Sequence, residues 1–248
     1  MGILKRIAGW LCAIFFILSL TASMLFYSLS EMTKNEERIK NAVYPIFKTF
    51  YLERAERENI EKAFEALKYY CSQNLTFPIN ISNVEINCSL ANMELEEFED
   101  YLLNLTLDSQ INEIYNFEYQ CGNLIECYNT YNFTFLLSSK ANKLYKKYSS
   151  NFLIISLILG FFVFILPETI SKKFLNLGGI LLFFSLQFFL ITIYLIPKLI
   201  PKDLKMAEGF VSLFYQYAKP KIQLLLIFSV FLIGVGIIFK FFEKRKIF

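Results

Sequence analysis

Histidine is absent from all 248 residues of the chain. Because histidine is the usual general base near neutral pH and the commonest metal ligand, Ser-His-Asp triads, Cys-His pairs and histidine-type zinc sites cannot be built from this chain alone. Carboxylate chemistry would need two acidic groups in a cleft, which the sequence does not disclose. We therefore predict a protein that is not an enzyme, with no catalytic residue and no cofactor.

Charged residues are absent from four long stretches. These are Ile7–Ser30, Tyr148–Pro167, Phe174–Pro197 and Ile222–Phe239, of 24, 20, 24 and 18 residues. At a rise of 1.5 Å per residue, roughly 20 apolar residues cross a hydrocarbon core of about 30 Å. The sequence therefore predicts a multi-pass protein with four spanning helices in a lipid bilayer. Ionisable residues usually mark proton or substrate paths, so their absence from these stretches argues against an ion-coupled transporter.

Lysine and arginine are absent from residues 69–139, which carry ten acidic side chains: Glu85, Glu94, Glu96, Glu97, Glu99, Asp100, Asp108, Glu113, Glu118 and Glu126. Such a segment repels nucleic acid phosphates and attracts cations or basic surfaces. The acids at 94–100 lack the spacing of a calcium loop, and a helix would scatter their carboxylates. We expect no nucleic acid partner and no metal site.

Four of the five cysteines lie in or beside this acidic segment, at Cys71, Cys88, Cys121 and Cys127. An even number confined to one loop predicts two disulfides and an oxidising compartment. Cys71 with Cys88 and Cys121 with Cys127 is the local pairing, and pairing between the two halves is the alternative. The spacings match no standard zinc signature.

Five Asn-x-Ser/Thr sequons fall in the same loop and none elsewhere, beginning at Asn74, Asn80, Asn87, Asn104 and Asn132. Their confinement indicates an exposed, glycosylated segment in a secretory compartment. Basic residues flank the predicted spans on both sides, so the positive-inside rule does not decide the orientation. Cysteines and sequons together place the loop outside the cell membrane and both termini in the cytoplasm.

The first apolar stretch follows a short basic start, a combination that also fits a cleaved signal peptide. It is longer than the apolar region of a signal peptide needs to be, because it continues through Met24 to Tyr27. We therefore favour an uncleaved anchor. Trp10 stands near its beginning, where interfacial aromatic residues often occur.

The long loop has a mixed, mostly helical pattern. Residues 31–70 have the pattern of amphipathic helices, interrupted near Pro45. Residues 73–90 have the pattern of short extended segments separated by a turn at Ser82–Asn83. A further helix is predicted after an N-cap at Asn92, followed by an irregular aromatic segment over 115–135. Between the third and fourth spans, Pro201 and Pro220 bracket a predicted amphipathic helix.

The predicted fold class is a mainly α, four-helix transmembrane protein with a disulfide-bearing extracytoplasmic domain between helices 1 and 2. Its parts are residues 1–30 (tail and first span), 31–147 (extracytoplasmic domain) and 148–248 (three spans, an amphipathic outer loop over 198–221 and a basic tail). This order is similar in topology to the claudin-like four-span junction proteins. Their Gly-Leu-Trp-Cys pattern has no counterpart, because Trp10 is the only tryptophan, so no family is assigned.

Two functions are compatible with these features. The first is a non-enzymatic surface protein whose acidic, glycosylated domain mediates interactions, with a protein partner or a homo-oligomer formed through that domain or the spans. The alternative is an accessory or pore-forming subunit of a membrane transport complex.

Overall fold

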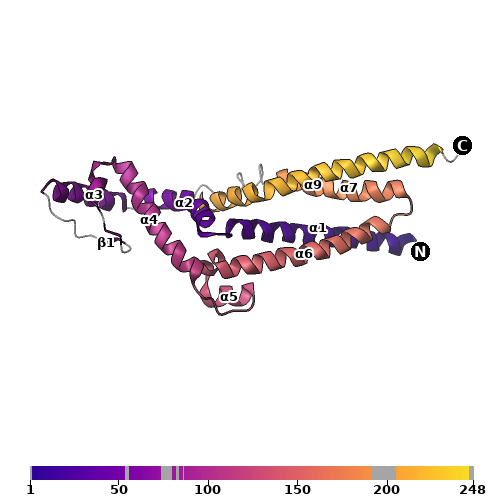
Figure 1. Cartoon of the computed structure of the whole chain (residues 1–248). Coiled ribbons are helices and arrows are strands. Elements are labelled where there is room, and N and C mark those ends of the chain that lie inside the picture. Colours follow the sequence, from indigo (N-terminus) through magenta and orange to yellow (C-terminus); the bar gives the residue numbers. More distant parts are fainter. Residues whose placement is uncertain are drawn as a thin grey trace. The chain divides into compact units, whose positions relative to one another are not determined.

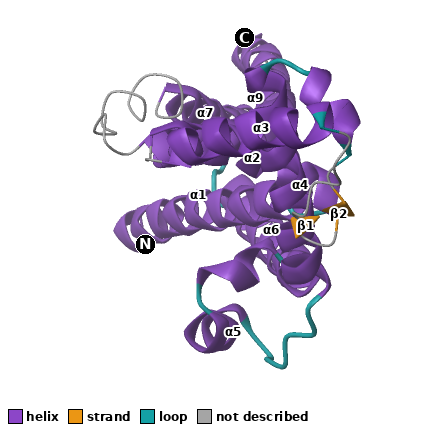
Figure 2. Cartoon of the chain, turned by 90° about the vertical axis from the view of Figure 1, so that its left-hand side faces the viewer, coloured by secondary structure: helices purple, strands orange, loops and turns teal. Residues whose placement is uncertain are grey.

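The computed structural model describes residues 2–53, 56–73, 80–81, 84–85, 87–190 and 205–245. The described chain is mainly helical, as predicted, and divides into two compact units (Figures 1 and 2). We call Met1–Met32 with Asn142–Phe248 the membrane unit, and Thr33–Ala141 the disulfide domain.

The membrane unit contains four long helices, α1 (Gly2–Met32), α6 (Ser139–Ile165, whose first residues belong to the disulfide domain), α7 (Ile170–Leu190) and α9 (Lys205–Arg245). The segments long and apolar enough to cross a membrane are Ile7–Met32, Ser139–Ile165, Ile170–Leu190 and Gln216–Arg245. The prediction of a multi-pass membrane protein is confirmed at this level. The third predicted span runs on to Pro197, but residues 191–197 lie outside the described residues. Both ends of the described chain and the link between α6 and α7 lie at the same end of this unit (Figure 1).

The two prolines predicted to interrupt helices do not end them. Pro220 lies inside α9, so the predicted helix over 198–221 and the fourth span form one continuous helix from Lys205 onward. Pro45 likewise lies inside α2 (Glu36–Glu53). A proline removes one N–H donor and crowds the carbonyl four residues earlier, which a helix held by its neighbours on both sides tolerates.

Helices α7 and α9 approach each other closely at two glycines. A Cβ atom added to Gly178 would lie 2.9 Å from Ile233 Cγ1, and one added to Gly236 would lie 2.8 Å from Leu175 Cγ. Small residues at such crossings let two backbones pack directly. The buried core of the unit extends from this contact to α1, through Phe16, Leu20, Met24, Leu181, Phe184, Ala218, Ile222 and Leu232.

Helices α1 and α6 are joined by hydrogen bonds and ring contacts. Ser23 Oγ donates to the Ser149 carbonyl and Ser149 Oγ donates to the Ser23 carbonyl, each at 3.0 Å. The Phe26 ring stacks on Phe152 with centroids 5.8 Å apart. These contacts hold α6 against the first span.

The disulfide domain contains α2, α3 (Glu56–Ser72), β1 (Asn80–Ile81), β2 (Val84–Glu85), the 3₁₀ helix η1 (Cys88–Asn92), α4 (Leu95–Asn116), α5 (Leu124–Tyr131) and the 3₁₀ helix η2 (Phe133–Leu137). The strands β1 and β2 form a short antiparallel pair, with Asn80 opposite Glu85 (Figure 2). The predicted turn at Ser82–Asn83 lies outside the described residues.

Helix α4 organises two apolar clusters. Its first turns pack against α3 and η1 in a cluster of Phe64, Leu67, Leu90 and Phe98. Its later turns pack against α2 in a cluster of Ile39, Val43, Leu103, Leu107 and Ile111. Because α4 buries residues toward two neighbours, it fixes α2 and α3 within one domain.

The start of α4 differs from the prediction. The N-cap is Glu94 rather than Asn92, which belongs to η1. The backbone N–H of Glu94 donates to Glu97 Oε2 at 3.4 Å, as in a capping box. The acidic residues of the first turn therefore support the helix terminus, where the helix dipole favours negative charge.

Candidate functional site

The four loop cysteines form the two local disulfides. Cys71, at the end of α3, pairs with Cys88, which begins η1, and their Cα atoms lie 5.5 Å apart. Cys121 pairs with Cys127 of α5, with Cα atoms 5.2 Å apart. Of the pairings that the sequence left open, the structure therefore forms the local one. Cys12 is a free cysteine, half-buried in α1.

The second disulfide stands beside a group of aromatic rings. The Tyr119 ring contacts Phe117, Tyr131 and Phe135 at centroid distances of 4.8, 5.0 and 5.4 Å. The Tyr119 hydroxyl donates to the Ile114 carbonyl at 3.2 Å, and burial raises the pKa of Tyr119. The tyrosine is thus a neutral donor that ties the end of α4 to α5 and η2.

Helix α5 lies in the segment that the sequence predicted to be irregular. Its N-cap is Asn123, whose side chain accepts from the backbone N–H of Glu126 at 2.9 Å. Glu126 in turn accepts from the Gly122 N–H at 2.9 Å. Asn and Glu three residues apart are a signature of a helix start, so this helix had a signal in the sequence.

Ion pairs join α2 to α4. Lys40 Nζ lies 2.7 Å from Asp108 Oδ1, and Lys48 Nζ lies 2.7 Å from Asp100 Oδ1. The hydrogen bond from Lys48 lowers the pKa of Asp100 and raises the pKa of Lys48. Desolvation by burial, with the hydrogen bond to Asp100 second, raises the pKa of Tyr44. Two carboxylates of the acidic segment thus form ion pairs with α2. The sequence pattern did not reveal these pairs.

The remaining carboxylates leave negative charge at both ends of α4. At these two ends, the exposed acidic residues that form no ion pair with a described residue are Glu94, Glu96, Glu97, Glu113 and Glu118. Across the disulfide domain, nine basic residues stand against seventeen acidic ones, a net charge of −8. Within the described parts of the chain, no three acidic or thiol groups are arranged to hold a metal ion. The arrangement can attract a cationic surface by its field.

The five sequons differ in their surroundings. Asn74 lies outside the described residues, and Asn80 lies in β1. Asn87 and Asn132 are exposed. Asn132 has a φ of 60° and a ψ of −156°, a backbone conformation that favours glycine.

Asn104 is held inside α4. Its Nδ2, the atom that would carry a glycan, donates to the Asp100 carbonyl at 2.8 Å. The hydroxyl of Thr106, the last residue of that sequon, donates to the Leu102 carbonyl at 2.9 Å. Both groups of the sequon are therefore engaged within the helix.

Several hydroxyl groups inside the described spans bond within their own helix. Ser156, Ser185 and Ser229 donate to the carbonyls of Leu153, Leu181 and Leu226, at 2.8, 2.8 and 2.7 Å. Such bonds satisfy a hydroxyl without a second helix or water. These serines therefore form no polar path across the unit.

Comparison of the chain with known protein families, with curated proteins and with solved structures finds no match.

Proposed function

We propose that the protein is a non-enzymatic surface protein of the cell membrane, with cytoplasmic termini and an external, glycosylated disulfide domain that binds basic partners. The observation that carries the proposal is the charge left on this domain after its internal ion pairs are counted. Lys40 and Lys48 neutralise one carboxylate each, whereas the exposed acids at the ends of α4 have no such partner among the described residues. Charge of one sign on a rigid surface favours encounter with the opposite sign.

The two disulfides support the proposed side of the membrane. Disulfides persist in oxidising compartments and are rare in the cytosol. Each of them joins short segments of the domain and leaves neither cysteine free for redox chemistry. A structural role outside the cell accounts for both.

A transport subunit is the less favoured function. A pore or ion path needs polar groups directed toward water or toward one another. The span serines named above bond to their own helices instead. The surface function therefore takes precedence.

A charge-removal experiment tests the partner class. The triple variant Glu96→Gln, Glu113→Gln and Glu118→Gln in the full chain is compared with Glu37→Gln, Glu61→Gln and Glu65→Gln, which removes three exposed acids among nearby lysines. The readout is association of fluorescent polylysine with intact cells at low salt. We expect about a tenfold slower association for the first variant and little change for the second. Equal association for both variants and the unaltered chain would refute the proposal.

Labelling of intact cells tests the orientation. In a Cys12→Ser background, a cysteine is introduced at Ser109, exposed in α4, or at Lys244, exposed near the end of α9. We expect an impermeant thiol reagent to modify the first and not the second. The reverse result would place the disulfide domain in the cytoplasm.

Glycan mapping gives a residue-level prediction of the same proposal. We expect glycans at Asn87 and Asn132 and none at Asn104, because the Asn104 amide and the Thr106 hydroxyl are bonded within α4. Mass spectrometry of the glycopeptides measures the occupancy of each site. Asn132→Gly, which suits the positive φ, should remove one glycan without loss of the fold. Full occupancy at Asn104 would contradict the prediction.

A further inference from the structure

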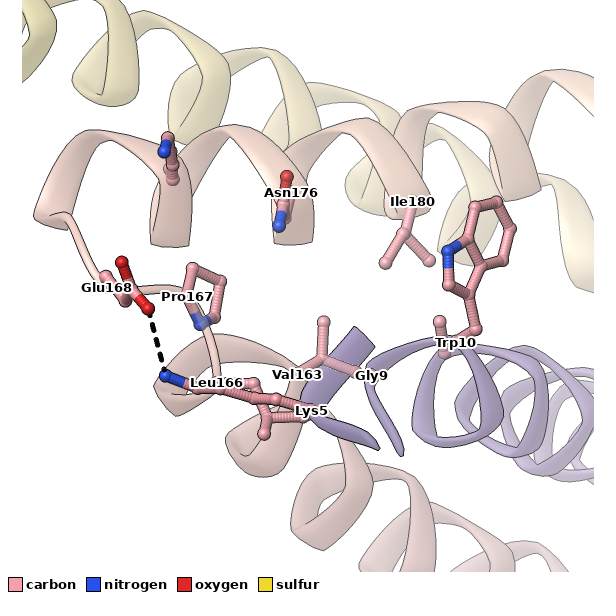
Figure 3. Close-up of a pocket in the computed structure, with 11 residues that line it drawn as sticks. Lys5, Gly9, Trp10, Val163, Leu166, Pro167, Glu168, Asn176 and Ile180 are labelled. Carbon is pink, nitrogen blue, oxygen red and sulfur yellow. Dashed lines mark ion pairs between the residues drawn. The ribbon is translucent and has the colours of Figure 1, made fainter. Parts of the chain in front are cut away.

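A cavity of about 650 Å³ opens in the membrane unit between α1, the end of α6 and α7. Its wall on α1 includes Lys5, Gly9 and Trp10, and its wall on α7 includes Ile180 (Figure 3). Lys172 of α7 also lines the cavity. All the lining residues belong to the membrane unit. The cavity is therefore a feature of one compact unit.

The polar end of the cavity lies at the edge of the spans. Lys5 and Lys172 stand just outside the first and third uncharged stretches, and Glu168 follows the proline that ends the second. Figure 3 shows Lys5 directed toward Glu168, and the Nζ to Oε1 distance is 3.6 Å. With both side chains largely exposed, such a pair contributes little. The charged residues that line the cavity are Lys5, Lys172 and Glu168, so the lining carries a net charge of +1. The Glu243 carboxylate, which accepts hydrogen bonds from Ser171, lies outside the lining and offsets part of the positive potential at Lys172.

The other end of the cavity is apolar and lies farther along the spans, away from the charged residues. Trp10 and Ile180 lie together there, while Val163 lies between the two ends (Figure 3). Ile180 is eight residues after Lys172, which is roughly 12 Å along a helix. Asn176 lies on α7 between these levels and extends toward the cavity (Figure 3). Polarity thus falls from the rim inward, in the direction in which a lipid passes from headgroup to acyl chain.

We propose that this cavity binds one anionic diacyl phospholipid, with its phosphate at Lys5 and Lys172 and the start of an acyl chain against Trp10, Val163 and Ile180. Charge complementarity favours the anionic lipid, since a zwitterionic headgroup brings its own cation to a rim that is already positive. Basic pockets between membrane helices are known to hold such headgroups. Trp10 is 74% exposed in the protein alone, so its ring has apolar surface available for the acyl chain.

The tryptophan also supplies the assay. Trp10 is the only tryptophan of the chain, so its fluorescence reports on this cavity without other signals. The full-length protein is reconstituted in nanodiscs of phosphatidylcholine, and acyl-brominated phosphatidylglycerol or acyl-brominated phosphatidylcholine is added at equal mole fraction. We expect quenching by the anionic lipid at up to about fivefold lower mole fraction, the preference given by a net charge of one basic residue near a membrane surface.

Matched variants distinguish lipid binding in the cavity from general attraction between basic residues and anionic lipid. Lys5→Gln with Lys172→Gln should abolish the preference, whereas Lys173→Gln, which removes a charge one residue away on the same helix and outside the cavity, should keep it. Ala13→Phe, which fills the cavity from α1 and leaves both lysines, should also abolish it. Native mass spectrometry of the same variants measures lipid retention independently of fluorescence.

Three results would overturn the proposal. Equal quenching by the two brominated lipids would show only general contact with the bilayer. A preference unchanged in the double lysine variant would place the anionic lipid elsewhere. Competition by soluble glycerol 3-phosphate as effective as that by phosphatidylglycerol would identify a phosphate site that does not use an acyl chain.

Discussion

The membrane unit and the disulfide domain hold their helices together in different ways. In the membrane unit, α7 and α9 meet at Gly178 and Gly236, where the backbones themselves are in contact. In the disulfide domain, α4 is joined to α2 by ion pairs, and α3 is joined to η1 by a disulfide. The same chain thus uses close steric fit in one unit and charged and covalent links in the other.

The difference follows from the solvent around each unit. Lipid chains are as apolar as leucine side chains, so burial of apolar area does not drive spanning helices together, and fit between surfaces matters more. In water, burial of the two α4 clusters does favour folding, but a domain of 109 residues has a small core. Covalent links that restrict the unfolded chain add to its stability.

Removal of a disulfide is the strongest way to break this comparison. Replacing Cys71 and Cys88 with serine should lower the free energy of unfolding of the disulfide domain by about 3 kcal/mol, from the entropy of a loop of 17 residues. Replacing Cys121 and Cys127, which close a loop of 6 residues, should lower it by about 2 kcal/mol. Amide hydrogen exchange of the full chain in detergent micelles measures both effects.

The pattern of exchange decides whether the units are independent. Faster exchange in α3 and η1, with unchanged exchange in α1 and α7, is the expected result for the Cys71 and Cys88 variant. Equal acceleration in both units would contradict the separation of their stabilities. Equal effects of the two disulfides would contradict the dependence on loop length.

A methyl group added at the glycine contact tests the other half of the comparison. Gly178→Ala places its Cβ atom 3.1 Å from the backbone nitrogen of Ile233, which cannot move aside as a side chain can. We expect a loss of about 1–3 kcal/mol from this overpacking. Thermal unfolding of the full chain in micelles, followed by far-UV circular dichroism, measures it.

The neighbouring glycine is the control. Gly179 has no atom within 4 Å of an added Cβ. Gly179→Ala should therefore stabilise α7 by about 0.5–1 kcal/mol, because alanine favours a helix interior more than glycine does. Two substitutions of the same kind at adjacent positions should thus have opposite signs. Destabilisation by both would show that the close contact is not the cause.

Parts of this structure with a single local cause were predictable from the sequence. The spans follow from uncharged length, and the apolar face of α3 follows from helical spacing, since Phe64 and Leu67, three residues apart, are both buried. Four cysteines allow three disulfide pairings, and the sequence did not distinguish them. The structure forms the local pairing because α3 and η1 bring Cys71 and Cys88 together. The predicted absence of catalytic groups rests on composition and stays a prediction.

Features that depend on two neighbours at once were missed. Leu103, Leu107 and Ile111 pack against α2, whereas Phe98 packs against α3 and η1, so α4 has no single apolar face for a periodic pattern to detect. The rule that proline interrupts a helix considers only neighbouring residues in the sequence. It does not include the tertiary packing that keeps α2 and α9 helical at Pro45 and Pro220. The ion pairs of α4 with α2 join residues 52 and 68 positions apart, which no local pattern reveals.

The smallest expected effect concerns the Lys48–Asp100 pair and its dependence on pH. The pKa of Asp100 is lowered in the folded state, so its contribution to stability is present above the ordinary carboxyl value of 3.8 and is lost as the pH falls through the lowered pKa. The pKa of Lys48 is raised, so its contribution is present below 10.5 and is lost as the pH rises through the raised pKa. The pair therefore stabilises the α2–α4 contact between these limits.

Asp100→Asn is the change that isolates this contribution. We expect a loss below about 1 kcal/mol at neutral pH, since both side chains are about two-fifths exposed and are screened by water. Hydrogen exchange of α2 and α4, measured from pH 7 down to about pH 2 and corrected for intrinsic exchange, should show a smaller decline for the variant than for the unaltered chain, because the asparagine does not titrate. Asp108→Asn is the matched control, and it should act more weakly because Asp108 is 60% exposed. An unchanged decline in Asp100→Asn would mean that other carboxylates set the acid sensitivity of the domain.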